Sequence, residues 1–193
     1  MNSALSAIQV LEEEHKVILR MVNVLTAIHE RLESGGDIDA ATLAEVVDFF
    51  RAFADKGHHA KEEDVLFPTL ERNGVRPQGC PIGTLTSEHK QGRALMTALN
   101  DAVEKYASGD SAAKVTISAT IKGAIDLYTD HIWREDYLLF PMTEKVLSKP
   151  ELEGVVRNFN EVETRFGSDF HNKYEQIVEK LEKSFNTNRK GGV

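Results

Sequence analysis

Cysteine is almost absent from this chain, which contains only Cys80 among its 193 residues. A single cysteine forms neither an internal disulfide nor a metal site built from several thiolates. Long apolar runs are also missing, because no uninterrupted stretch approaches the roughly 20 residues that a membrane-spanning helix needs. The sequence therefore predicts a protein outside the membrane, in which any metal chemistry falls to the seven histidines and the carboxylates.

A surplus of basic residues is missing as well. Lys and Arg number 23 against 31 Asp and Glu, which gives a formal net charge of −8. An acidic surface repels nucleic acid, so we expect no DNA or RNA partner. The first 16 residues carry three consecutive glutamates in place of the basic segment that opens a secretory signal. We therefore expect a cytoplasmic location.

Strand patterns are lacking too. Aromatic residues make up only 7% of the chain, and no stretch alternates polar and apolar residues as a half-buried strand does. Apolar residues recur instead at intervals of three and four, which is typical of amphipathic helices. Because short connections make neighbouring helices antiparallel, we predict an all-α protein: an up-down-up-down antiparallel four-helix bundle with an additional C-terminal helix.

Breaks rich in glycine, proline and serine set the expected boundaries. The bundle is expected over residues 1–148, built from a two-helix repeat at about 8–72 and 82–147. A C-terminal helix over 149–187 is expected to pack on the bundle or to extend it. Residues 188–193 form a short polar segment that we interpret as a flexible tail.

The most informative pattern is an internal duplication. The segment HHAKEEDVLFP at 58–68 has the same length as HIWREDYLLFP at 131–141, and both contain His first, a basic residue fourth, Glu fifth and Leu-Phe-Pro last. Upstream, Glu-His-Lys at 14–16 matches Glu-His-Lys at 88–90. The intervals between the paired histidines, 43 and 42 residues, also agree. Two matches in register indicate one two-helix unit used twice.

Each repeat places a histidine and a glutamate four residues apart, and hence on one face of a helix about one turn apart. These residues, and the histidine of the preceding helix, fall on the apolar stripes that face the bundle interior. Buried ionised carboxylates are costly unless they are paired or bind a metal. We therefore predict two metal ions, each with two histidines, bridged by the two glutamates. The predicted ligands are His15, His58, Glu62, His89, His131 and Glu135.

Iron is the expected metal. Imidazole combined with carboxylate suits non-haem iron, whose recurring ligand set is two histidines and one carboxylate. Zinc favours closed four-coordinate sites, or three ligands and a water. Two iron ions with bridging carboxylates are therefore predicted, with manganese or zinc as the less favoured occupants.

Three further residues are candidates for an additional or supporting role. His59 has Glu63 four residues on, so this pair could compete with the adjacent predicted pair, although the second repeat has Ile132 in the place of His59. Tyr128 lies one turn before the predicted ligand of the fourth helix, and it is interpreted either as core or as a hydrogen-bond donor to a ligand.

The remaining notable residues have structural interpretations. His29 lies about 21 Å along the helix from the predicted site, given a rise of 1.5 Å per residue, and His171 falls outside the repeat. The glutamates at 12–14 are interpreted as a solvated run near a helix N-terminus, where negative charge is favourable. Trp133 is expected to point away from the site and to pack on the C-terminal helix or on a partner chain.

The repeated His and His-x-x-x-Glu pattern, followed by Leu-Phe-Pro, resembles the hemerythrin family, the HHE cation-binding domain. The resemblance covers roughly residues 8–147 and implies an up-down-up-down bundle with an oxo- or hydroxo-bridged di-iron centre held by the same six residues. Oxygen-carrying hemerythrins have a fifth histidine where this chain has Leu85. The four-histidine, two-glutamate set is closer to bacterial hemerythrin-like proteins and to di-iron proteins that repair iron–sulfur clusters. A ferritin-like site would need Glu-x-x-His twice, and Thr86 breaks the second copy.

The function expected from this set is binding of, or reaction with, dioxygen, nitric oxide or peroxide at open metal positions, in a response to oxidative or nitrosative stress. Because the bundle is apolar, we expect small neutral molecules to reach the metals. Turnover of peroxide or nitric oxide, donation of iron to damaged clusters, and iron or oxygen sensing through the C-terminal helix are the alternatives. No catalytic residue is assigned, and a homodimer formed through Trp133 stays open.

Overall fold

The computed structural model describes residues 5–187, and every regular element within this range is a helix. The bounds, with η marking π-helical segments, are α1 (Ala7–Glu33), α2 (Ala40–Phe49), η1 (Phe50–His59), η2 (Glu62–Leu66), α3 (Phe67–Arg72), α4 (Ile82–Ala107), α5 (Ala113–Arg134), η3 (Glu135–Leu139), α6 (Phe140–Val146), α7 (Lys149–Glu163) and α8 (Phe170–Phe185). The expected all-α class is confirmed. The predicted tail at 188–193 lies outside the described residues.

Local sequence signals explain where the first helices begin and end. Ser6 and Gln9 form a capping box at the start of α1, because each side chain bonds the backbone N–H of the other. After α1, Gly35 adopts a φ of +82°, a left-handed conformation that glycine takes without steric cost. Asp39 occupies the N-cap position of α2, although its side chain makes no capping hydrogen bond.

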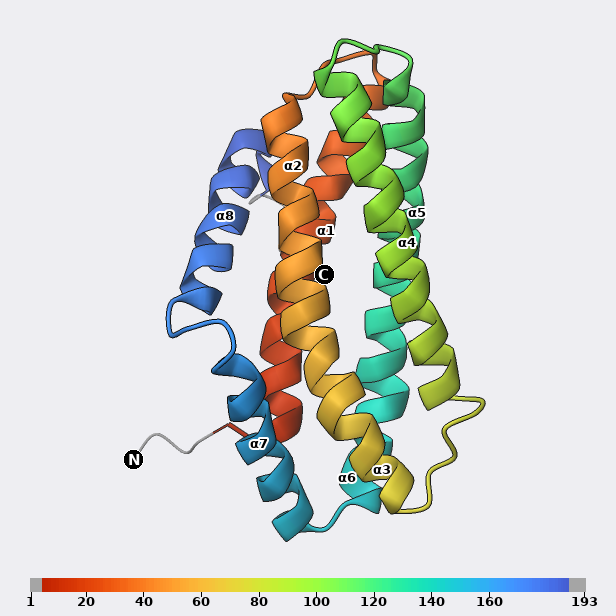
Figure 1. Cartoon of the computed structure of the whole chain (residues 1–193), viewed down its shortest axis with the longest axis vertical. Coiled ribbons are helices and arrows are strands. Elements are labelled where there is room, and N and C mark those ends of the chain that lie inside the picture. The colour runs from red at the N-terminus through yellow and green to blue at the C-terminus, as the bar shows by residue number, and fades with distance from the viewer. Residues whose placement is uncertain (1–4, 188–193) are drawn as a thin grey trace.

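Four long helical segments lie side by side (Figure 1). The first repeat supplies α1 and the run from α2 to α3, and the second supplies α4 and the run from α5 to α6. The α4 helix packs against α5 within its own repeat, while α1 packs against α5 and α2 against α4 across the two repeats. The duplicated units therefore form one helical bundle with a shared interior.

The apolar interior is divided into two clusters. One contains Ile18, Ala54 and Met96, and extends to the α8 helix. The other contains Leu11 and Leu66, and extends to the α7 helix. Between them, along each of the four long segments, lie the buried histidines and glutamates that the duplication singled out. The polar residues thus occupy a belt that hydrophobic residues close off on both sides.

The second helix of each repeat is not a regular α-helix throughout. Residues 50–59 and 62–66 are π-helical in the first repeat, and 135–139 are π-helical in the second. The segments η2 and η3 begin at Glu62 and Glu135, which are matching positions of the repeat. Such wider turns are uncommon and are found frequently at functional sites. A pattern of apolar residues at intervals of three and four does not reveal them.

The single C-terminal helix expected over 149–187 is wrong, because the structure has two helices there. The break lies between Glu163 and Phe170, where Gly167 has a φ of +84°. The α7 helix buries Phe159 in the cluster around Leu11, and the α8 helix buries Val178 in the cluster around Ile18. Both helices therefore pack on the first repeat, mainly against α1.

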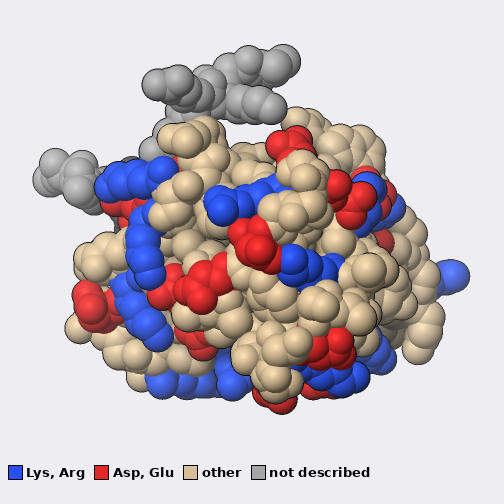
Figure 2. Space-filling view, turned by 90° about the horizontal axis from the view of Figure 1, so that it is seen from above, with Lys and Arg blue, Asp and Glu red and all other residues tan. Residues whose placement is uncertain are grey.

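Charged side chains of both signs are interspersed over the end of the bundle seen in Figure 2. The connections before α2 and before α5 lie at this end (Figure 1), where Lys114 forms an ion pair with Asp37. Within residues 5–187, no helix combines the length and the hydropathy that crossing a membrane requires.

Candidate metal centre

The structure brings all six predicted ligands together in the buried belt. They come from both repeats: His15 on α1, His58 on η1, Glu62 on η2, His89 on α4, His131 on α5 and Glu135 on η3. Each is at most 2% exposed to solvent. Residues up to 120 positions apart in the chain therefore meet at one point of the bundle.

The four histidines form two pairs whose Nε2 atoms face each other. The Nε2 atoms of His15 and His58 are 3.1 Å apart, and those of His89 and His131 are 3.2 Å apart. Two imidazole nitrogens that converge in this way can bind one cation, since imidazole nitrogen is a common ligand of transition metals.

The two glutamates lie between these histidine pairs. Glu135 reaches both, with Oε2 at 3.0 Å from His15 Nε2 and Oε1 at 3.2 Å from His131 Nε2. Glu62 Oε2 lies 3.8 Å from His58 Nε2 and 3.4 Å from His89 Nε2. The result is two sets of four donors, each with two histidines and both carboxylates, whose ligand atoms lie within 4.8 Å of one another.

The carboxylate oxygens show that this donor set fits cations. All four side-chain oxygens of Glu62 and Glu135 are buried, and none makes a hydrogen bond within the described residues, although Nε2 atoms lie as close as 3.0 Å. Leaving an ionised carboxylate unpaired in a protein interior is costly, so such groups are normally neutralised by a partner or a metal. Two metal ions between the histidine pairs would satisfy all four oxygens.

A carboxylate from the same repeat orients one histidine of each pair. His58 Nδ1 donates to Glu14 Oε2 at 3.0 Å, and His131 Nδ1 donates to Glu88 Oε2 at 3.0 Å. Because an ionised carboxylate only accepts hydrogen bonds, Nδ1 carries a proton and Nε2 points into the belt. Histidine ligands in metal sites are commonly held in this way by a second group.

The other two histidines are oriented by a carboxylate from the opposite repeat. His15 Nδ1 donates to Asp136 Oδ1 at 2.7 Å, and His89 Nδ1 donates to Glu63 Oε1 at 2.6 Å. Asp136 directly follows Glu135 in the sequence, and Glu63 directly follows Glu62. These two contacts thus cross between the repeats.

The interpretation of residues 12–14 as a solvated run is wrong for Glu14, which is only 4% exposed. Besides orienting His58, it forms an ion pair with Lys61, which is buried. In the second repeat, Glu88 pairs with Arg134 at 2.7 Å in the same way. The sequence contained the signal for these contacts, since both Glu-His-Lys triplets and the basic fourth positions are parts of the duplication.

Burial and the surrounding carboxylates act in opposite directions on the histidines. Burial disfavours the charged form of His15, yet its hydrogen bond to Asp136 and the nearby carboxylate of Glu135 raise its pKa to about 10. The pKa of His89 is raised to about 11 and that of His131 to about 9, in each case against burial and through the neighbouring glutamates. Protons therefore compete with a metal ion for these nitrogens.

His59 and Tyr128 lie beside the belt rather than within it. The ring of His59 stacks on that of His89 at 3.9 Å, and a ring nitrogen of His59 lies within 4.8 Å of nitrogens of His89 and His131. Burial and the neighbouring histidines lower the pKa of His59 well below its usual value. Tyr128 is buried and packs on Phe50 at 4.6 Å. Neither residue lies within either of the two four-donor sets.

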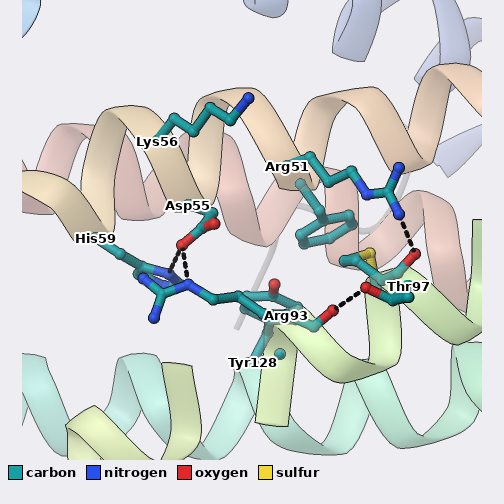
Figure 3. A pocket seen from close by; sticks show the side chains of 10 residues that line it. Arg51, Asp55, Lys56, His59, Arg93, Thr97 and Tyr128 are labelled. Carbon is teal, nitrogen blue, oxygen red and sulfur yellow. Dashed lines mark hydrogen bonds and ion pairs between the residues drawn. The ribbon is translucent and has the colours of Figure 1, made fainter. Parts of the chain in front are cut away.

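A pocket of about 230 Å³ adjoins His59 (Figure 3). Its walls come from η1, α4 and α5, and the close-up shows Asp55 between His59 and Arg93. Arg51 and Lys56 also line it, so charged side chains are prominent in its wall.

The other singled-out residues lie outside both four-donor sets. His29 Nδ1 lies 2.9 Å from the Ser118 hydroxyl. His171 is 40% exposed and lies 3.2 Å from Glu163. Trp133 does point away from the site, but within residues 5–187 it is 55% exposed and contacts the Tyr137 ring rather than the C-terminal helices.

Comparisons with known proteins agree with this geometry. Residues 6–143 match the hemerythrin HHE cation binding domain. Similar curated proteins include uncharacterized proteins of Mycobacterium bovis and Mycobacterium tuberculosis, which are 28% identical over 175 residues, or 90% of this chain and 68% of theirs. No solved structure matches the chain significantly. Because the domain match spans most of the chain and includes the whole histidine and glutamate belt, the protein belongs to the hemerythrin HHE cation-binding domain family.

Proposed function

We propose that this chain binds two iron ions bridged by Glu62 and Glu135. In this assignment one ion takes His15 and His58, and the other takes His89 and His131. The observation that carries the proposal is the set of four buried carboxylate oxygens without hydrogen-bond partners, placed between two converging histidine pairs. Iron is preferred because imidazole combined with carboxylate is the typical donor set of non-haem iron.

The function proposed for this centre is binding of, or reaction with, a small ligand such as dioxygen, nitric oxide or peroxide. Each ion would receive two nitrogen and two carboxylate donors, which leaves positions open for a ligand. A di-iron centre supplies reversible electron transfer and a Lewis-acidic binding position. We also infer that the helices form an up-down-up-down bundle and that the protein is cytoplasmic and acts in the defence against oxidative or nitrosative stress.

The contribution of the chain itself is to orient the donors. Glu14, Glu88, Asp136 and Glu63 each accept a hydrogen bond from a histidine Nδ1, which directs the Nε2 atom of that histidine into the belt. The hydrophobic clusters on both sides exclude bulk water, which strengthens electrostatic interactions within the belt.

Metal analysis with an ultraviolet–visible spectrum tests the proposal directly. The wild-type protein, reconstituted anaerobically with ferrous iron, should contain about two irons per chain and should show near-ultraviolet charge-transfer bands after oxidation. His58→Ala and His131→Ala should each lower the iron content, because each removes a donor from a different ion. His29→Ala is the matched control, since His29 contacts Ser118 away from the belt. Two irons per chain in both ligand variants would refute the assignment.

Ligand addition then tests the reactivity. Nitric oxide or peroxide added to the iron-loaded protein should change the spectrum, and a progressive loss of either reagent would distinguish turnover from binding. An iron-loaded protein whose spectrum responds to neither reagent nor to dioxygen would contradict the proposed function while leaving the metal site intact.

A further inference from the structure

The pocket beside His59 is charged in a way that the protein as a whole is not. Arg51, Lys56 and Arg93 line it together with a single carboxylate, that of Asp55. The complete chain has a net charge of −8. A concave surface lined by a surplus of one sign concentrates ligands of the opposite sign and raises their association rate.

Ion pairing does not cancel this surplus at the mouth of the pocket. Arg93 is engaged, with its Nε at 2.8 Å from Asp55 Oδ1 and its Nη2 at 2.9 Å from Glu63 Oε2. Arg51 makes only a long contact of 3.4 Å to the Met96 carbonyl oxygen. Lys56 is exposed and forms no ion pair within residues 5–187. Two cationic groups are therefore free to attract an anion.

His59 lies between the pocket and the histidines of the belt. It lines the pocket, yet it is only 2% exposed, and its Nδ1 lies 3.5 Å from Asp55 Oδ1 without forming a hydrogen bond within the described residues. Its ring stacks on His89 at 3.9 Å and lies edge-on to His131 at 5.5 Å.

Size limits what the pocket can take. Its volume of about 230 Å³ is below the roughly 300–1,000 Å³ of pockets for drug-sized ligands. A Cβ atom at Gly92 would lie 3.2 Å from the Tyr128 hydroxyl, so the glycine keeps this wall open where α4 and α5 approach each other. The pocket suits a ligand of a few atoms.

We propose that this pocket is the entrance through which a small inorganic anion reaches the metal centre, and that His59 positions the arriving ligand by a hydrogen bond. The inference rests on the proposed function, because it names the ligand class of the same centre. Arg51 and Lys56 select for negative charge at the mouth. His59 is a positioning residue, which acts where the pocket meets His89 and His131.

Association rates of azide and nitric oxide, measured by stopped flow on the iron-loaded protein, test the entrance. The double variant R51Q/K56Q should slow azide association about 3- to 10-fold at low salt, within the range of electrostatic steering. The difference from wild type should shrink as salt rises, and the rate for neutral nitric oxide should not change. Lys105→Gln removes a positive charge outside this pocket and is the control. An unchanged azide rate, or an equal slowing for nitric oxide, would overturn the selection for anions.

Dissociation of azide tests His59. His59→Ala should speed azide release about 10-fold by removing a hydrogen bond, and His59→Gln should restore slow release because its amide can still donate. Iron content is measured for every variant, so that loss of metal is not mistaken for loss of positioning. Equal dissociation rates in all three proteins would refute the role of His59.

A measurement on the metal-free protein distinguishes a failure of the proposed function from a failure of the entrance proposal. Azide titrated into isotope-labelled metal-free protein should shift the backbone NMR signals of Lys56, Arg93 and Thr97, and R51Q/K56Q should weaken this response. If the chain takes up no iron and the shifts still occur, the pocket binds anions while the di-iron proposal fails. If no shifts occur in the metal-free protein and the azide rate is insensitive to charge, the entrance proposal fails.

Discussion

Glu14 and Glu88 occupy matching positions of the duplication, but replacing them by glutamine should have unequal effects on stability. Each accepts a hydrogen bond from a histidine Nδ1 at 3.0 Å, and each pairs with a basic residue. The partner of Glu14 is Lys61, which is 1% exposed, whereas the partner of Glu88 is Arg134, which is 32% exposed. The two substitutions therefore leave their positive charges in different surroundings.

The magnitudes follow from this difference. Breaking a buried ion pair costs about 3–5 kcal/mol, because the remaining charge is left without compensation. Glu163 still lies 2.8 Å from Lys61, and the glutamine carbonyl still accepts a hydrogen bond, so we expect Glu14→Gln to lower the free energy of unfolding by about 2–3 kcal/mol. Arg134 can turn to water, so Glu88→Gln should cost less than about 1 kcal/mol. For a domain of this size the difference is roughly 5 °C in Tm.

Urea unfolding of the two metal-free variants, followed by circular dichroism, measures this difference. Iron affinity, measured by chelator competition, provides the internal comparison, because both variants should lose about 10- to 100-fold through the lost support of one ligand. Equal destabilisation of the two variants would refute the reasoning that Lys61 depends on Glu14 more than Arg134 depends on Glu88. Equal stability combined with unchanged iron affinity would also remove these glutamates from the site.

Two further outcomes follow from the structure. In the metal-free protein, three of the predicted histidine ligands have pKa values of about 9 to 11, above the unfolded value of about 6.5. The stability that these histidines add to the folded protein is therefore complete below about pH 6.5 and is lost as the pH rises to about 9–11. Iron affinity should rise over the same pH interval. Thermal unfolding of the metal-free and the iron-loaded protein checks both the fall in stability and the rise in affinity. Gly57→Ala would place a Cβ 2.9 Å from the Phe170 ring and should destabilise the chain by about 1 kcal/mol despite its better helix propensity. Gly154→Ala, whose nearest contact is 3.6 Å, should instead stabilise it slightly in the same urea assay.

The duplication accounts for most of what the sequence could reveal about the site. His58 and Glu62 lie on the apolar stripe of their helix, and burial of that stripe brings them into the interior with their counterparts. Burial of the equivalent stripes brings all six predicted ligands into one belt, because both repeats have the same local geometry. Their role as iron ligands stays a prediction.

The supporting residues were harder to predict from local patterns. Glu14 lies within three consecutive glutamates, and the local rule for helix N-termini favours a solvated interpretation. Its contacts with His58 and Lys61 span 44 and 47 residues, so a local rule does not reveal them, although the duplication contained a signal for them. The π-helical segments were missed for a related reason, since one widened turn leaves the intervals between apolar residues almost unchanged.

The break in the C-terminal region had a visible signal that a longer helical pattern masked. Gly167 is followed by serine and aspartate, much as Gly109 stands between serine and aspartate at the end of α4. Apolar residues continue on both sides of Gly167, which favoured one uninterrupted helix. The α7 helix instead ends at Glu163, and Gly167 adopts its positive φ in the turn that leads to α8, which also packs against α1.

The two halves of the belt differ in how they are enclosed, although the duplication makes their donors alike. The α7 and α8 helices pack mainly on the first repeat, where Lys61 is buried and lies 2.8 Å from Glu163. On the second repeat, Arg134 stays partly exposed and the pocket approaches His89 and His131 through His59. An ion held by the first pair would therefore exchange slowly, and one held by the second pair would exchange quickly. Such a centre would bind its two ions in sequence, with one ion bound persistently and the other exchanging readily.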